Sequence, residues 1–325
     1  MSGLNTQKNG ARTQDAPQVI VLTGPTATGK TALGVELALA IGGEVISADS
    51  MQIYRRMDIG TAKPAIEELR GVPHHMLSVA EPDEDYSVSR YVEEASRCVD
   101  DVLARGKVPI LVGGTGLYID SLLSSRSFAE RGDGALREKL GAEYDALGGE
   151  EMRRRLAEFD PERAALLQTQ DKRRIVRAME IYYLTGKTIT QHDAETRALP
   201  PRYTSLRIAL SFAEREALYA RIDRRVDEML KRGLFDEVRA LLDSGVPGES
   251  TAMQAIGYKE VAACIAGECS AEEAIEAVKR NSRRYAKRQL TWLRRDKELH
   301  WLVWENEPDI AQGVLFSTDL LCTAR

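Results

Sequence analysis

The chain has 325 residues, a length that favours two domains or one domain with a large insertion. Hydrophobic residues make up 43% of it, but no stretch approaches 18 consecutive apolar residues, so we expect no membrane-spanning helix. The four cysteines form no C-x-x-C pair, which is typical of reduced thiols in a cytoplasmic protein. The formal net charge of −5 by itself argues against a nucleic-acid partner.

The N-terminal third begins with a polar segment and continues with a strand, a glycine-rich loop and a helix. Residues 1–16 are polar and lack the apolar stretch of a secretory signal, so we expect a disordered tail. The apolar run 19–22 predicts a buried strand, and Ala and Leu at helical spacing predict a helix over 31–41. The loop between them fits the pattern G-x-x-x-x-G-K-[ST], with Gly24, Pro25, Thr26, Ala27, Thr28, Gly29, Lys30 and Thr31.

This loop predicts a site for a diphosphate or triphosphate. Backbone N–H groups of the loop and of the helix N-terminus would point at one position and favour an anion there. Lys30 would add a positive charge, and the hydroxyl of Thr31 would contact a Mg²⁺ ion. The loop does not indicate which phosphate compound binds or what reaction follows.

Further apolar runs alternate with helical segments. We expect strands over 44–48 and 108–112, a helix over 88–104 between them, and later strands over 206–210 and 301–304. Asp49 ends the second strand and the glycine-rich segment 113–116 ends the third. Ligands of an open parallel α/β sheet lie at the carboxyl ends of its strands, so these turns should surround one site. The prediction is an α/β fold of the P-loop NTPase type, with a parallel sheet flanked by helices.

The middle of the chain has no comparable β pattern. Residues 126–199 are charged and helix-forming, and Asp160-Pro161 is typical of a helix start. We expect a helical insertion over 126–199 that contacts an RNA substrate, within a core formed by 17–125 and 200–312.

Positive charge is concentrated in three clusters. Residues 279–297 contain nine Lys or Arg and one acidic residue, with Tyr285 and Trp292 among them, which indicates an anionic partner. A second cluster comprises 172–174 and Arg177. The third, 153–155, is flanked by acidic residues and is interpreted as a solvated helix face.

A phosphate loop followed by a carboxylate at the next strand end suits two reactions. In a kinase or ATPase, Asp49 would hold magnesium or act as a base while the γ-phosphoryl group moves. In an alkyl transfer, the loop would instead hold a departing diphosphate while a carbon–oxygen bond breaks. The loop alone does not separate them.

Seven further segments separate these reactions because, in this order, they resemble the signature of tRNA dimethylallyltransferases. They are 49–55, 57–64, 72–75, 111–118, 171–180, 256–260 and 285–294. The zinc-finger extension of the eukaryotic members is absent, so the resemblance is to the bacterial type.

The resemblance implies transfer of a dimethylallyl group from dimethylallyl diphosphate to the exocyclic amine of the adenine 3′ of the tRNA anticodon. It also implies a Mg²⁺ cofactor and a monomeric, cytoplasmic enzyme without nucleotide hydrolysis. Asp49 would accept a proton from the amine, and Thr115 would line the same channel. Arg221 and Arg225 lie in a segment that supplies an arginine to the diphosphate, and spacing does not decide between them.

The residues expected to contact the tRNA anticodon arm come from four regions. They are Asp49, Ser50, Met51 and Gln52; Lys172, Arg173, Arg174, Ile175, Val176 and Arg177; Gln254, Gly257, Tyr258 and Lys259; and Arg283, Arg284, Lys287 and Arg288. The adjacent pair His74-His75 is interpreted as structural or RNA-contacting, because neighbouring side chains point in different directions and do not form a metal pair.

Two alternatives remain at this point. A small-molecule kinase would use the loop and Asp49 but not the basic clusters. An adenylate isopentenyltransferase would share the loop chemistry but would need no surface of tRNA size. The insertion and the basic segment 279–297 favour tRNA over both.

Overall fold

The computed structural model describes residues 17–125 and 134–323. The tail expected at 1–16 and the first residues of the expected insertion, 126–133, lie outside the described residues. The chain divides into two compact units, one comprising Ser124–Arg202 and the other the segments on either side of it. The larger unit contains the sheet and the smaller unit is helical.

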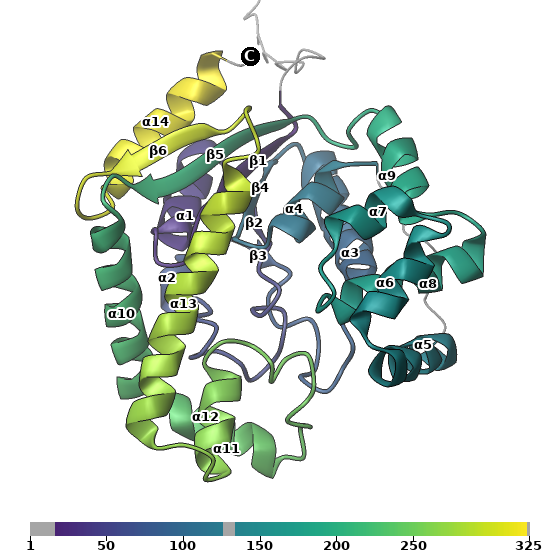
Figure 1. The fold of residues 1–325 in the computed structure, drawn as a ribbon. Helices are drawn as coiled ribbons and strands as arrows, with labels where there is room; N and C mark the ends of the chain where they lie inside the picture. Colours follow the sequence, from purple (N-terminus) through teal and green to yellow (C-terminus); the bar gives the residue numbers. More distant parts are fainter. Residues whose placement is uncertain (1–16, 126–133, 324–325) are drawn as a thin grey trace, which may run out of the picture. The chain divides into compact units, whose positions relative to one another are not determined.

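A six-stranded parallel sheet forms the centre of the larger unit (Figure 1). Its spatial order is β3-β2-β4-β1-β5-β6, so β1, β2 and β4 lie next to one another and their carboxyl ends share an edge. The strands are β1 (Val19–Thr23), β2 (Gly43–Ser47), β3 (His74–His75), β4 (Val108–Val112), β5 (Ser205–Phe212) and β6 (His300–Trp304). The predicted α/β fold with a parallel sheet is confirmed.

Helices cover both faces of this sheet, which explains why the central strands are apolar throughout. Ile20 and Leu22 of β1 face a core that includes α1, while Val19 and Val21 face a core that includes α3 and α4. The helices of the larger unit are α1 (Lys30–Ile41), α2 (Ile66–Leu69), α3 (Val88–Ala104), α4 (Gly116–Leu123), α10 (Arg215–Lys231), α11 (Leu234–Asp243), α12 (Tyr258–Ile265), α13 (Ala271–Leu293) and α14 (Ile310–Thr323).

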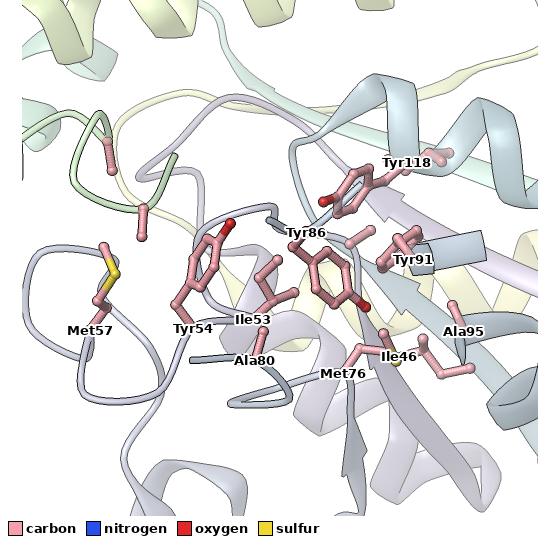
Figure 2. Close-up of a cluster of buried hydrophobic side chains, with 14 of the residues drawn as sticks. Ile46, Ile53, Tyr54, Met57, Met76, Ala80, Tyr86, Tyr91, Ala95 and Tyr118 are labelled. Carbon is pink, nitrogen blue, oxygen red and sulfur yellow. The ribbon is translucent and has the colours of Figure 1, made fainter. Parts of the chain in front are cut away.

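A cluster of tyrosines and aliphatic side chains fixes the carboxyl end of β2 (Figure 2). Tyr91 of α3 and Tyr118 of α4 stack with ring centroids 3.9 Å apart. The hydroxyl of Tyr91 donates a 2.9 Å hydrogen bond to the carbonyl of Ser47, the last residue of β2. Because Asp49 follows two residues later, this core fixes the start of the segment that carries the carboxylate.

The predicted strands occur at the expected places, but the two-residue strand β3 at His74–His75 was not anticipated. It pairs with Val45 and Ile46 of β2 at the edge of the sheet. A strand of two residues is too short to show an alternating pattern, so the sequence contains no periodic signal for it.

The smaller unit is built from helices around its own core, as the absence of β patterns predicted. The helices are α5 (Gly134–Leu147), α6 (Gly149–Ala157), α7 (Pro161–Leu166), α8 (Lys172–Thr185) and α9 (Ile189–Ala198). Asp160 caps α7 by accepting a hydrogen bond from the N–H of Arg163, so the predicted helix start is confirmed. Ile175 and Val176 are buried in the core of this unit, so the prediction that their side chains contact tRNA is wrong.

The basic clusters of the smaller unit are ion-paired within it. Arg154 pairs with Glu151 and Glu158 on the same helix, which confirms the predicted solvated face for residues 153–155. In the second cluster, Lys172 pairs with Asp145 and Arg177 with Glu180, whereas Arg173 is exposed. Over the described part of the chain, no helix combines the length and hydrophobicity needed to cross a membrane.

Candidate active site

A cavity of about 940 Å³ lies within the larger unit where β1, β2 and β4 end. Its wall includes the phosphate loop after β1, Asp49 to Gln52 after β2 and Gly113-Gly114 after β4. Further walls come from α10, α13 and the segment 60–64. The three turns that the sequence placed at strand ends therefore meet in one site, because their strands are neighbours in the sheet.

The phosphate loop has the compact backbone that its glycines permit. Gly24 has φ 147°, and a Cβ there would lie 2.6 Å from the carbonyl oxygen of Leu210. The side chain of Thr28 is buried and donates a 2.9 Å hydrogen bond to the carbonyl of Pro25, so it is not available to a ligand. Lys30 begins α1 and its Nζ donates to the same carbonyl at 2.6 Å. Thr31 is exposed and lines the cavity, so its hydroxyl is accessible from the cavity.

Two cations beside this loop form no ion pair among the residues that the structure describes. Burial and the positive charge of Arg225 lower the pKa of Lys30 to about 7, and Asp49 only partly opposes this effect. Burial also lowers the pKa of Arg225. Among the described residues, the buried Nε of Arg225 has no hydrogen-bond partner, and its NH2 donates to the carbonyl of Thr61 at 3.5 Å. Both cations line the cavity, which therefore suits an anionic ligand.

Arg221 lies one helical turn before Arg225 on α10 and has different hydrogen-bond and ion-pair partners. Its Nε donates a 3.0 Å hydrogen bond to the carbonyl of Ala27 in the phosphate loop. Its guanidinium also forms an ion pair with Glu307, which pairs with Arg224 as well. Arg225, unlike Arg221, thus forms no ion pair among the described residues, a distinction that sequence spacing did not provide.

Asp49 is held at the end of β2 by local hydrogen bonds. Its Oδ1 accepts from the N–H groups of Met51 at 2.9 Å and Gln52 at 3.4 Å. The hydroxyl of Thr115 accepts from the N–H of Ser50 at 3.0 Å, while the N–H of Thr115 donates to Ala48 at 3.1 Å. Thr115 was expected to line the cavity with Asp49. It is not among the described residues that line this cavity, and its hydrogen bonds anchor the residues on either side of Asp49.

Close packing explains the glycines at 113, 114 and 116. A Cβ at Gly113 would lie 2.2 Å from the carbonyl oxygen of Ala48, and one at Gly114 would lie 2.2 Å from Nε2 of Gln289. A Cβ at Gly116 would lie 2.4 Å from the indole ring of Trp292. The segment is therefore pressed between the end of β2 and helix α13, and larger residues do not fit without displacement.

The segment 58–64, which forms another wall, is fixed by a carboxylate that the sequence analysis missed. Glu237 of α11 accepts from the N–H groups of Asp58, Ile59 and Gly60 at 2.9, 2.8 and 3.0 Å. The hydroxyl of Tyr258 donates to the same carboxylate at 2.5 Å. On an amphipathic helix, Glu237 looks like an ordinary solvent-facing residue, so no local signal identifies it.

This arrangement corrects part of the predicted tRNA surface. Tyr258 is fully buried against Gly60 and Glu237, so its side chain is structural and the predicted tRNA contact is wrong. Gly257 is also buried and precedes α12 with φ 99°. Gln254 and Lys259 are exposed and line the cavity. The cavity is also lined by the predicted residues that follow Asp49, which are Ser50, Met51 and Gln52.

Helix α13 carries the basic segment that was predicted to bind RNA. Some of its cations form ion pairs with α10 and others are exposed. Arg283 pairs with Asp223 at 2.5 Å and Lys279 with Asp227 at 2.7 Å, both acids on α10. The expectation that the cations of 279–297 lack acidic partners is therefore wrong for these two. Arg288 lies over the ring of Tyr285, with 5.5 Å from its Cζ to the ring centroid. Arg284 and Lys287 are exposed.

The two neighbouring histidines have different partners. The Nδ1 atom of His74 lies 2.9 Å from the carbonyl of Val72, whereas Nε2 of His75 lies 2.8 Å from Glu44. Burial lowers the pKa of His74, which lines the cavity.

In the described ranges, no group of three or more His, Cys, Asp or Glu side chains could hold a metal ion. The oxygens of Thr31 and Asp49 both line the cavity, and such a pair suits Mg²⁺ when phosphate oxygens complete its coordination.

The fold and site define a P-loop protein with an anion-binding cavity, and comparison with known proteins identifies the family. The family model described as IPP transferase matches residues 52–296, and one described as isopentenyl transferase matches residues 17–83. The chain belongs to the family of tRNA dimethylallyltransferases, also called tRNA isopentenyltransferases.

Individual relatives agree with this assignment. A tRNA dimethylallyltransferase of Desulforudis audaxviator is 49% identical over 88% of this chain and 92% of its own length. The tRNA isopentenylpyrophosphate transferase of Bacillus halodurans has a TM-score of 0.71 at 39% identity, covering 95% of this chain and 98% of that one. A eukaryotic dimethylallyltransferase, solved acting on tRNA, has a TM-score of 0.80 at 29% identity, covering 95% and 80% of the two chains.

We expect binding of inorganic diphosphate to draw a proton onto Lys30. The pKa of Lys30 is about 7 without an anion, and a bound diphosphate raises it toward the ordinary value of 10.5. Between these values each binding event takes up close to one proton, so affinity is greatest below pH 7 and falls as pH rises through this range. Titration calorimetry at pH 8 in buffers of different ionisation enthalpy measures the uptake.

The matched control is Lys30→Met, which removes the titrating group while the ionisation of the diphosphate itself stays the same. Equal proton uptake by the two proteins would contradict the assignment of the proton to Lys30.

Proposed function

We propose that this protein transfers a dimethylallyl group from dimethylallyl diphosphate to the exocyclic amine of the adenine 3′ of a tRNA anticodon. The observation that carries the proposal is the cavity in which two buried cations, Lys30 and Arg225, share a wall with the carboxylate Asp49. Such a site suits a reaction in which a diphosphate leaves and a nucleophile loses a proton. Membership of the family supplies the substrates.

The phosphate loop would hold the diphosphate of the donor. Backbone N–H groups at the start of α1, the ammonium of Lys30 and the guanidinium of Arg225 would stabilise the negative charge that grows as the carbon–oxygen bond breaks. Arg221, which also lines the cavity, would support the loop through its hydrogen bond to Ala27. Thr31, with the phosphate oxygens, would hold Mg²⁺, which supplies further charge neutralisation when bound.

Asp49 would act on the acceptor. The lone pair of an adenine amine is delocalised into the ring, so the amine becomes a useful nucleophile only as its proton is removed. In the balanced reaction the nitrogen–carbon bond forms, the carbon–oxygen bond breaks with its electrons leaving on the diphosphate, and the proton passes to the Asp49 carboxylate. An adenine stacked in an anticodon loop cannot reach Asp49, so the base must be flipped into the cavity.

The family assignment supports tRNA over the two alternatives. A small-molecule kinase would have no use for the exposed cations of α13. An adenylate isopentenyltransferase would require neither those cations nor a second, helical unit. The proposal includes a monomeric enzyme that acts on tRNA in the cytoplasm.

The first test is a labelling experiment. With radiolabelled dimethylallyl diphosphate and Mg²⁺, and without ATP, we expect label to enter bulk tRNA and not AMP. Labelling of AMP instead would favour the adenylate isopentenyltransferase, and a strict requirement for ATP hydrolysis would favour the kinase.

The second test concerns the carboxylate. Asp49→Asn keeps an acceptor for the N–H of Met51 but cannot take a proton, so we expect kcat to fall about 10²-fold or more. The KM for dimethylallyl diphosphate should change little. Steady-state kinetics with both substrates, beside a thermal unfolding curve, measure this. Near-normal turnover would remove Asp49 from the proton transfer.

The third test concerns the RNA surface of α13. Neutralising Arg280, Arg284 and Lys287, which are exposed, should weaken tRNA binding. It should also flatten the slope of log affinity against log salt by about 0.7 to 0.9 for each tRNA phosphate that the variant no longer neutralises. Diphosphate affinity should not change. Filter binding at several salt concentrations measures the affinity and the slope.

The control for this test is Arg239→Gln, an exposed cation on α11 that is paired with Asp236. An unchanged salt slope in the triple variant would exclude these three side chains from the tRNA interface.

A further inference from the structure

One buried side chain joins the phosphate loop to the segment that anchors Asp49. Gln289 of α13 is 8% exposed and lines the cavity. Its Oε1 accepts a 3.0 Å hydrogen bond from the N–H of Thr26 in the phosphate loop. Its Nε2 donates a 3.0 Å hydrogen bond to the carbonyl of Gly114, after β4. The two ends of one carboxamide therefore hold two turns that belong to different strands.

The Gly114 end of this bridge leads to the carboxylate. Thr115, the next residue, binds Ala48 through its N–H and Ser50 through its hydroxyl. These two residues flank Asp49 in the sequence. A continuous set of hydrogen bonds thus runs from Thr26 through Gln289 and Thr115 to the residues that carry the carboxylate.

Only a carboxamide satisfies both partners. A carboxylate at position 289 could accept from Thr26 but would oppose the carbonyl of Gly114, which needs a donor. A hydrocarbon side chain at position 289 would leave the N–H of Thr26 and the carbonyl of Gly114 without these partners in a partly buried region, which lowers stability. Because the N–H of Thr26 is already bonded to Gln289, that group orients the loop and does not bind phosphate.

The rate of alkyl transfer depends on the distance between the phosphate loop and the turn that carries Asp49. The amine nitrogen, the carbon and the leaving oxygen must lie nearly in line, with the oxygen on the phosphate loop and the amine proton on Asp49. A displacement of about 1 Å in such an arrangement costs on the order of 10²-fold in rate, even when both ligands still bind.

We propose that Gln289 is a positioning residue that fixes the distance between the diphosphate cradle and Asp49. This inference rests on the proposed function, because it concerns the alignment of the same two substrates. Gln289 touches neither reacting atom in this role. Its loss should therefore affect the chemical step and leave the binding of each substrate nearly intact.

The test compares Gln289→Ala and Gln289→Glu with wild type. We expect kcat to fall about 10²-fold in the alanine variant, with the KM values for dimethylallyl diphosphate and tRNA within about threefold of wild type. The glutamate variant, which has the same shape and keeps the Thr26 contact, should also lose activity. Affinity for inorganic diphosphate, measured by calorimetry, shows whether the phosphate loop still forms.

Thr291→Ala is the matched control on the same helix. Thr291 is exposed, and its hydroxyl bonds only the carbonyl of Lys287 among the described residues. Its kinetics should equal those of wild type.

A second pair of variants separates alignment from packing. A Cβ at Gly114 would lie 2.2 Å from Nε2 of Gln289, so Gly114→Ala should displace the side chain and break the bridge. In the double variant Gly114→Ala/Gln289→Ala the collision is gone. We expect thermal stability to recover toward that of Gln289→Ala while kcat remains low. Recovery of kcat together with stability would show that Gln289 only fills space and would overturn the proposal.

The remaining outcomes are also decisive. Unchanged kcat in Gln289→Ala overturns the proposal, and so does normal kcat at saturation with a large rise in the KM for the donor, which would assign a binding role. If wild type itself fails to label tRNA, the proposed function fails, whereas every outcome that overturns the proposal for Gln289 requires an active wild type.

Discussion

Positive charge held partly away from water, and only partly balanced by nearby carboxylates such as Asp49, is the constraint on which the cavity depends. Lys30 on α1 and Arg225 on α10 lie close enough that the positive charge of one makes the charged form of the other less stable. The protein tolerates them because the pKa of Lys30 falls to about 7, so that without a ligand this side chain is largely neutral above that pH. An anionic substrate restores the charge and removes the penalty. The cavity therefore favours an anionic ligand because the fold places more positive than negative charge around it.

A charged cavity of this kind has to be held open by rigid surroundings, and the structure provides them on each side. The tyrosine core of Figure 2 holds the end of β2. Glu237 fixes the 58–64 segment through three consecutive backbone N–H groups, and the buried Lys63 donates to the carbonyl of Tyr54 and to Asp58. Asp49 and the phosphate loop therefore lie on turns, and the side chains that fix the site's turns lie both on helices, as Tyr91 and Glu237 do, and within the 58–64 segment itself, as Lys63 does.

Much of the fold was predictable because its signals are local. The apolar runs of β1 and β4 and the glycine-rich loop between β1 and α1 each identify an element by themselves, and the sheet order then brings their ends together. Burial and pairing were not predictable in the same way. Arg283 looks unpaired in the sequence, since its partner Asp223 is 60 residues away. Tyr258 lies in a family motif that suggests RNA contact, and only the packing against Gly60 reveals that it is part of the core.

The tight fit of the 113–116 turn against α13 also constrains how this protein can change over evolutionary time. Gly114 and Gln289 are 175 residues apart in the chain. The side chain of Gln289 nevertheless occupies the space that a side chain at position 114 would need. Gly116 and Trp292 are related in the same way. Mutations in the two segments are therefore not independent: a larger residue in the turn is acceptable only after a smaller one has appeared on the helix. Recombination that exchanges α13 between distant relatives would separate these matched pairs, and it should fail more often than exchange at the surface.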